Sequence, residues 1–419
     1  MDEFERRMRR IVIPGRNINP EHMPFITMKY LSDKQEETIN KNEFLKKYGF
    51  LFRDYELLSN IIEKQEEEDE SYISDIKSSI IALKNSQNKY IKEVYSKINE
   101  DNLKKEFLDD VLSILNTDLN LFNIAIRNKY RRGMTQSPLK LYKLMADIAT
   151  SNHKVSKVYD PTCHEGLSIT SLKEFDKATL YEQDEEKYTQ AIQNFIVNDI
   201  PLEKISITNK EVLIDEDETK YDTIVSLPFL NTQRKITEFT QDKYSKYKSR
   251  NPLSLYLLNL IEHLDETGLL ITTITQDILV RKDAQNLRKC LIENNLLDAV
   301  FEFEGIRGFN ELVIIINKNK NTEDVLFIKI PQHNVLRSIR ERRIVKCFMD
   351  RSIIKRFSNV VSKEEIIKNE YKLLPKRYVY SLKYETCSIE DVKTQQEEYT
   401  EEIRKLDEEI GKLLEELKE

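Results

Sequence analysis

Two short polar segments of this chain carry the residue types that could act chemically on a ligand. The first reads Asp160-Pro161-Thr162-Cys163-His164-Glu165-Gly166 and follows an apolar run at 155–159. The second reads Ser226-Leu227-Pro228-Phe229 and follows a β-rich run at 221–225. Ligands of open parallel sheets bind just beyond the carboxyl ends of the strands. Acids, an imidazole and hydroxyls at two such strand ends therefore indicate a ligand site.

The elements that must position these segments are short β-rich runs that alternate with helical stretches. The runs lie at 155–159, 179–181, 205–207, 221–225, 269–274, 298–303, 311–316 and 325–330. Alternation of this kind is typical of an α/β protein with a doubly wound, parallel sheet. Residues 50–130 have a helical period instead, with apolar residues such as Leu57, Ile61, Leu112 and Leu115, and they predict an all-α region.

The overall composition limits the function classes that the chain can belong to. Its 419 residues favour two to three domains. The net charge is −7 although 33% of the residues are charged, so any contact with nucleic acid must come from local patches.

The cysteines and histidines predict neither a metal centre nor a disulfide framework. The four cysteines form no CxxC pair, and the five histidines form no metal-binding motif. This usage predicts a reduced, cytoplasmic compartment. The charged first residues exclude a secretory leader, and no apolar run is long enough to predict a membrane span.

Three strand ends resemble the motifs of adenine-N6 DNA methyltransferases, in particular the modification (M) subunit of Type I restriction–modification systems. In that family the first strand ends in Asp-Pro-x-Cys-Gly-Ser-Gly, the second in Tyr-Gly-Gln-Glu, and the fourth leads into Asn-Pro-Pro-Phe/Tyr. Here the corresponding stretches are 160–166, Tyr181-Glu182-Gln183-Asp184 and 226–229. The resemblance extends over residues 18–380 and includes the run Tyr30-Leu31-Ser32-Asp33.

The resemblance implies a Rossmann-like methyltransferase core, which is a mostly parallel sheet with helices on both faces. An all-α N-terminal domain precedes this core and a C-terminal helix follows it. We expect the helical domain at 1–132, the methyltransferase-like α/β domain at 133–385 and a coiled-coil-like helix at 386–419.

The resemblance also implies S-adenosylmethionine as the cofactor. The matching donor-binding positions are Thr135, Asp160, Pro161, Cys163, Gly166 and Asp184. Asp184 matches the acid that holds the ribose hydroxyls, and its alternative role is that of a solvated acid at a strand end. His164 replaces a glycine and fills space near the donor. Glu165 adds a negative charge where the donor carboxylate lies, so we expect weak or absent donor binding.

The catalytic positions implied by the resemblance are Ser226, Leu227, Pro228 and Phe229. In the family, the Asn side-chain oxygen and the carbonyl of the first Pro accept hydrogen bonds from the amine of a flipped adenine. Ser226 is shorter than Asn, and Leu227 keeps a carbonyl without the rigidity of proline. We therefore expect impaired methyl transfer. The alternatives are an active adenine-N6 DNA methyltransferase and, less well supported, a small-molecule methyltransferase.

Two further segments indicate macromolecular partners. The loop at 231–250 mixes basic residues with Tyr244 and Tyr247, which suits DNA phosphates and bases, although an ordinary exposed loop is equally compatible. The tail places apolar residues at alternating intervals of four and three, which is the seam of a coiled coil. The seam is Tyr399, Ile403, Leu406, Ile410, Leu413 and Leu417. In the family such helices pack on the specificity (S) subunit, so we expect an S-type subunit or a second copy as partner. Packing on its own chain is the alternative.

Overall fold

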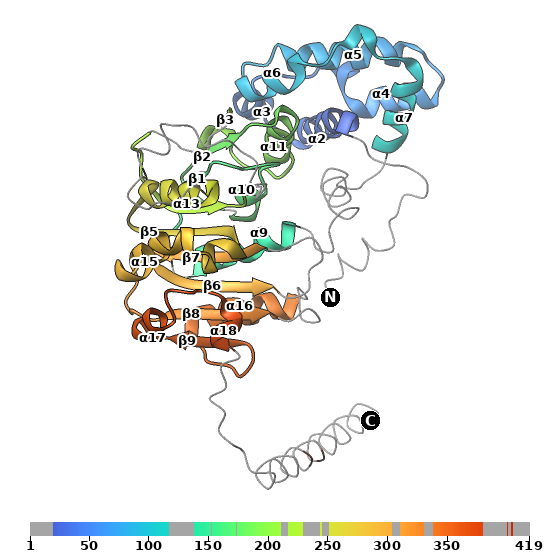
Figure 1. The fold of residues 1–419 in the computed structure, drawn as a ribbon. Coiled ribbons are helices and arrows are strands. Elements are labelled where there is room, and N and C mark those ends of the chain that lie inside the picture. The colour runs from blue at the N-terminus through green and yellow to red at the C-terminus, as the bar shows by residue number, and fades with distance from the viewer. Residues whose placement is uncertain are drawn as a thin grey trace.

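The computed structural model describes residues 20–116, 138–151, 153–172, 174–210, 217–228, 251–303, 311–330 and 338–379, with Tyr244, Thr400 and Arg404. These residues form a helical region beside an α/β region (Figure 1). The predicted fold class is confirmed, with a large, mostly parallel sheet that follows a helical N-terminal region. The expected domain boundary at 132/133 and the C-terminal helical seam lie outside the described residues and stay predictions.

The helical region consists of short helices whose ends are encoded locally. They are α2 (Met23–Glu37), α3 (Lys41–Tyr48), α4 (Leu58–Glu66), α5 (Ser71–Lys84), α6 (Lys89–Ser96) and α7 (Lys105–Leu115), with 3-10 turns at Pro20–His22, Asp54–Glu56 and Glu100–Asn102. The side chains of Asn40 and Asn88 accept backbone N–H groups at the starts of α3 and α6. Gly49 ends α3 with a left-handed φ of 75°.

The α/β region is built on a nine-stranded sheet within the described residues. The strands are β1 (Lys157–Asp160), β2 (Lys177–Glu182), β3 (Ile205–Asn209), β4 (Tyr221–Ser226), β5 (Leu264–Thr275), β6 (Leu297–Phe303), β7 (Glu311–Asn317), β8 (Val325–Ile330) and β9 (Ser358–Val361). Their order is β3-β2-β1-β4-β5-β7-β6-β8-β9. The strands from β3 to β5 are parallel, whereas β7 is antiparallel to both of its neighbours and β9 is antiparallel to β8.

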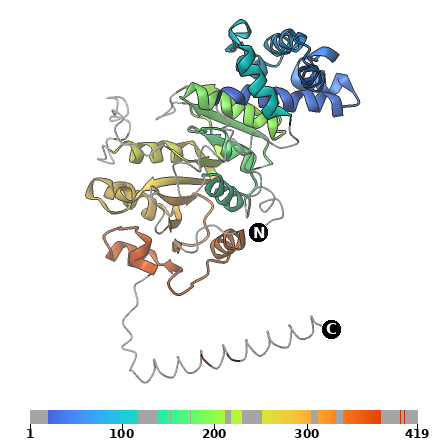
Figure 2. The same cartoon turned by 90° about the vertical axis from the view of Figure 1, so that its right-hand side faces the viewer.

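Helices cover both faces of this sheet, as Figures 1 and 2 show. One buried cluster contains residues of α9 (Pro138–Ser151), α10 (Leu167–Leu172), α11 (Glu185–Val197) and α16 (Ser338–Asp350). The other contains residues of α13 (Pro252–His263), α14 (Gln276–Val280), α15 (Gln285–Glu293), α17 (Lys363–Lys368) and α18 (Pro375–Val379). Because both faces are covered, β6 and β8 are buried along almost their whole length and are mostly apolar.

The helical region is joined to the sheet through α11 and the edge strand β3 (Figure 1). The hydroxyl of Tyr90 donates to the carbonyl of Ile205 at 2.8 Å, and Tyr188 donates to Glu93 at 2.8 Å. Apolar residues of α2 and α6 belong to the same buried cluster as residues of α10 and α11. The two regions therefore share one continuous hydrophobic core.

None of the helices in the described ranges is both long and apolar enough to cross a membrane.

Candidate functional site

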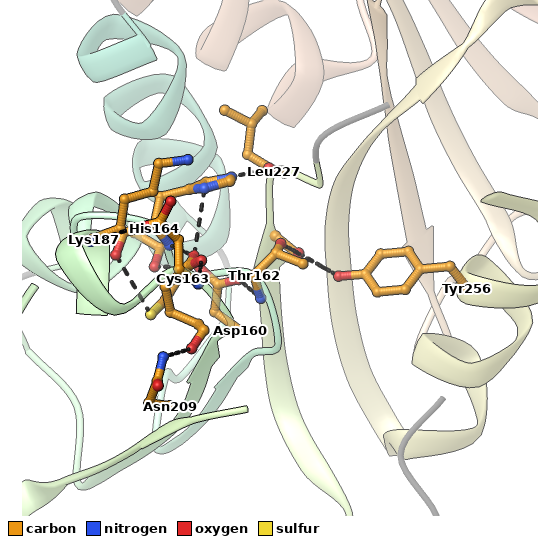
Figure 3. A network of polar contacts seen from close by, with 12 residues as sticks. Asp160, Thr162, Cys163, His164, Lys187, Asn209, Leu227 and Tyr256 are labelled. Carbon is orange, nitrogen blue, oxygen red and sulfur yellow. Dashed lines mark hydrogen bonds and ion pairs between the residues drawn. The ribbon is translucent and has the colours of Figure 1, made fainter. Parts of the chain in front are cut away.

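The two polar segments meet because β1 and β4 are neighbouring parallel strands. Parallel pairing brings the carboxyl ends of both strands to the same edge of the sheet, as expected from the sequence. The hydroxyl oxygens of Thr162 and Ser226, which follow β1 and end β4, lie 2.8 Å apart. Figure 3 shows the polar network that results.

Asp160 ends β1 at the centre of this network and is fully buried. Its carboxylate accepts the backbone N–H of Thr162 at 3.0 Å and the hydroxyl of Ser168 at 2.5 Å. Burial raises the pKa of Asp160 to about 7, against the lowering effect of these hydrogen bonds. Asp160 thus holds the loop that follows β1 in a closed turn.

Two residues of the loop after β1 adopt the left-handed backbone conformation that glycine favours. Gly166 has a φ of 72°, and a Cβ there would lie 2.4 Å from Cε1 of Phe195, so only glycine fits. His164 also lies in the left-handed region, with a φ of 49°. A side chain in this conformation costs about 1–2 kcal/mol. His164 therefore adopts a backbone conformation that glycine takes up without strain, at a position where the family motif has glycine.

The imidazole of His164 fills the space between the two strand ends. Its Nε2 lies 2.7 Å from the carbonyl oxygen of Leu227 (Figure 3). A carbonyl only accepts hydrogen bonds, so Nε2 carries the hydrogen and donates it. Nδ1 lies 3.5 Å from Oε2 of Glu182. The side chain is buried, and burial lowers the pKa of His164, which favours the neutral ring.

Glu182, at the end of β2, is the acid that faces the loop. Its buried carboxylate accepts the backbone N–H of His164 at 2.9 Å and that of Asp184 at 2.8 Å. Asp184 is exposed and caps α11 by accepting the N–H of Lys187 at 3.0 Å. The predicted ribose-binding role of Asp184 remains untested, but the carboxylate of Glu182 is the one placed at the loop. Asp is a preferred residue at the N-cap, the position immediately before a helix. The sequence could therefore have assigned Asp184 to the helix cap and Glu182 to the loop.

Negative groups surround the centre of the loop. Glu165 is buried, and the side-chain amide of Asn194 donates to its carbonyl oxygen at 2.7 Å. Burial raises the pKa of the Cys163 thiol well above its ordinary value, and the nearby charges of Asp160, Glu182 and Glu165 raise it further. The thiol is thus neutral and unsuited to nucleophilic chemistry. A ligand carboxylate would meet several acids here.

Ser226 is fully buried and its hydroxyl is engaged on both sides. It lies 2.8 Å from the hydroxyl of Thr162 and 2.7 Å from that of Tyr256 on α13. The carbonyl of the next residue, Leu227, accepts from His164. Both oxygens that the family would offer to an amine are therefore occupied by side chains of this chain.

The structure brings most of the predicted site residues together. Asp160, Pro161, Cys163 and Gly166 lie in the β1 loop, and Ser226, Leu227 and Pro228 lie beside it, whereas Thr135 and Phe229 are outside the described residues. Sequence reasoning missed the partners that complete the network: Thr162, Ser168, Glu182 and Tyr256. No metal-binding group of three or more His, Cys, Asp or Glu occurs within the described ranges.

Solved structures that are similar to this chain include two methyltransferase subunits and a restriction endonuclease. The type I restriction–modification methyltransferase subunit from Streptococcus thermophilus superposes with a TM-score of 0.70 at 16% identity, covering 85% of this chain and 92% of that chain. The modification subunit of a putative type I restriction enzyme from Vibrio vulnificus YJ016 gives 0.61 at 13%, covering 85% and 91%. The type IIG restriction endonuclease BpuSI gives 0.53 at 13%, covering 84% of this chain and 46% of that chain.

The fold is thus the one seen in these type I methyltransferase and modification subunits. The chain belongs to the N-6 DNA methylase family, whose sequence profile matches residues 119–386, more than half of its length. A comparison with curated protein sequences gave no match.

Proposed function

We propose that this protein is a subunit of the type I modification class in which methyl transfer is impaired, and that it serves as a DNA- and partner-binding assembly subunit. The observation that carries the proposal is the burial and hydrogen bonding of the Ser226 hydroxyl. Its hydroxyl is buried between Thr162 and Tyr256, so the position offers no amide oxygen to an adenine amine.

The chemical argument follows from what methylation of an exocyclic amine requires. Two oxygen acceptors must orient the amine so that its lone pair faces the methyl group. Ser226 has a shorter side chain than the Asn of the family and already has two hydroxyl partners. Leu227 keeps the second acceptor only as a flexible carbonyl, without the fixed φ of proline. For scale, loss of one preorganised hydrogen-bonding group, an oxyanion-hole donor, costs about 10²–10³ in rate in other enzymes.

The partner role rests on segments that lie largely outside the described residues. One residue of the loop at 231–250 is described: Tyr244 is buried, and its hydroxyl donates to Glu262 at 2.7 Å, so it does not stack on a base as the sequence suggested. The basic residues of this loop would contact DNA phosphates, and the apolar seam of the tail would pack on helices of a specificity-type subunit or of a second copy. Target choice would then reside in the partner chain. S-adenosylmethionine is the donor if any transfer survives.

Transfer of tritiated methyl groups from S-adenosylmethionine to DNA tests the proposal. The unaltered protein, alone and with a specificity subunit from the same locus, should give no incorporation above background. Adding Ser226→Asn and Leu227→Pro to a protein that carries His164→Gly and Glu165→Ser should raise incorporation. The matched control is the protein with the two loop changes only, which should stay inactive. Robust transfer by the unaltered protein contradicts the proposal.

One observation favours the second candidate, an active adenine-N6 DNA methyltransferase. Glu182 supplies a buried acid at the end of β2, and Gly166 keeps its left-handed turn, so part of a donor site is retained. The transfer experiment on the unaltered protein separates the two candidates directly.

A further inference from the structure

His164 connects the two halves of the site, which are the loop after β1 and the segment that follows β4. Its backbone belongs to the loop after β1, and its ring reaches the carbonyl of Leu227, which follows β4, at 2.7 Å (Figure 3). Leu227 stands at the position of the first proline of the family tetrapeptide. The acceptor that the family offers to a substrate amine is thus bonded to an N–H of the protein itself.

We propose that the imidazole of His164 is an internal occupant of the amine site, which latches the donor loop onto the catalytic strand end and must be displaced before S-adenosylmethionine can bind. This inference rests on the proposed function, because it gives Leu227 the role of an amine acceptor. The chemistry matches, since an imidazole Nε2–H and the amine of adenine are both planar nitrogen donors that point a hydrogen at a carbonyl oxygen.

Further contacts hold the ring in place. Glu182 accepts the backbone N–H of His164 at 2.9 Å, so β2 fixes the loop that carries the ring. The left-handed backbone of His164 directs the side chain into the site, where the residue is only 6% exposed. The hydroxyl contacts of Ser226 with Thr162 and Tyr256 tie the same two strand ends together a second time.

The latch makes donor binding depend on one side chain. Displacing the ring breaks the hydrogen bond to Leu227 and moves a buried group into water. A net hydrogen bond alone corresponds to about a tenfold change in affinity. Glycine at 164 removes both the occupant and the backbone strain. Asparagine tolerates the left-handed backbone but is too short to span the site, so it removes the latch and leaves the loop conformation intact.

Calorimetric titration of S-adenosylmethionine into four proteins tests the inference: wild type, His164→Gly, His164→Asn and a control, His153→Asn. His153 also contacts β4, through Thr223 at 3.1 Å, but at the opposite end of the strand. Both His164 variants should bind the donor at least about tenfold more tightly than wild type. The His153 variant should match wild type. Wild-type affinity equal to that of the His164 variants overturns the latch.

A second measurement keeps the inference testable if the variants unfold. The chain has only five histidines, so ¹⁵N-histidine labelling gives a short list of ring signals. The latch requires a slowly exchanging Nε2–H signal from His164, which His164→Asn identifies by its loss. A ring protonated at Nδ1 alone, or an Nε2–H in rapid exchange with water, would contradict the latch.

These results separate the latch from the proposed function. Tighter donor binding by His164→Gly without methyl transfer to DNA supports both. Transfer by the wild type defeats the proposed function, and tight donor binding by the wild type without transfer defeats only the latch.

Discussion

Replacing Asp160 with Asn should change the pH dependence of stability in a direction fixed by burial. The carboxylate is fully buried at the end of β1, and its pKa is raised from an ordinary value of 3.8 to about 7. Below pH 3.8 the group is protonated in both the folded and unfolded states, so its contribution to stability is fully present. As the pH rises, the unfolded chain ionises first, and stability falls until the folded group ionises near pH 7.

The size of this effect follows from proton linkage. One proton bound only by the folded state changes the free energy of unfolding by about 1.4 kcal/mol per pH unit. Between pH 5 and pH 7 the wild type should therefore lose about 2 kcal/mol that Asp160→Asn does not lose, because the slope flattens as the folded group begins to ionise. The asparagine oxygen can still accept the N–H of Thr162, and its amide can donate to the hydroxyl of Ser168. The free energy of unfolding of Asp160→Asn should therefore increase relative to that of the wild type as the pH rises.

Urea unfolding followed by circular dichroism at pH 5, 6, 7 and 8 measures the difference. The control is Asp222→Asn, because Asp222 accepts the N–H groups of Ser156 and Lys157 and its pKa is lowered to about 2. The stability that Asp222 contributes is lost only as the pH falls from 3.8 through about 2. The difference in free energy of unfolding between Asp222→Asn and wild type should therefore be constant from pH 5 to pH 8. Parallel curves for wild type and Asp160→Asn would refute the reasoning.

Two further changes test the loop and the tail. Gly166→Ala should cost about 3 kcal/mol in urea unfolding, because it combines a left-handed φ with a clash on Phe195, whereas Gly268→Ala meets mainly a flexible side chain and should cost less. Leu406→Asp with Leu413→Asp should abolish assembly, measured by size-exclusion chromatography with light scattering, and leave the melting temperature of the core unchanged. A wild-type monomer that binds no specificity subunit would contradict the assembly role.

Hydrophobic patterning was enough to predict the sheet and the meeting of the two polar segments. Runs such as 269–274 are mostly apolar because the strands are buried on both faces, and parallel pairing of β1, β4 and β5 then fixes which ends coincide. The short edge strand β9, Ser358–Val361, was not predicted, because four residues carry little periodic signal.

The detailed site could not be predicted, because its contacts join residues far apart in the chain. Tyr256 reaches Ser226 from α13, 30 residues later in the chain, and no motif in the sequence around Tyr256 marks it as a site residue. The contact of His164 with Leu227 depends on a left-handed backbone angle, which a motif comparison registers only as a missing glycine. The choice between Glu182 and Asp184 was the exception, because the N-cap preference of Asp184 before α11 was a usable signal in the sequence.

The continuous core between the helical region and the sheet has a mechanical consequence. Met28 and Ile91 of the helical region and Ile192 and Phe195 of α11 are almost completely buried in one cluster. Any swing of the helices away from the sheet would expose these side chains at about 25 cal/mol per Å² of apolar surface. We therefore expect the helical region and α11 to move together as one rigid body. If the protein closes around a DNA duplex, the hinge must lie elsewhere in the chain. The helical region, β3 and α11 would then move as one unit.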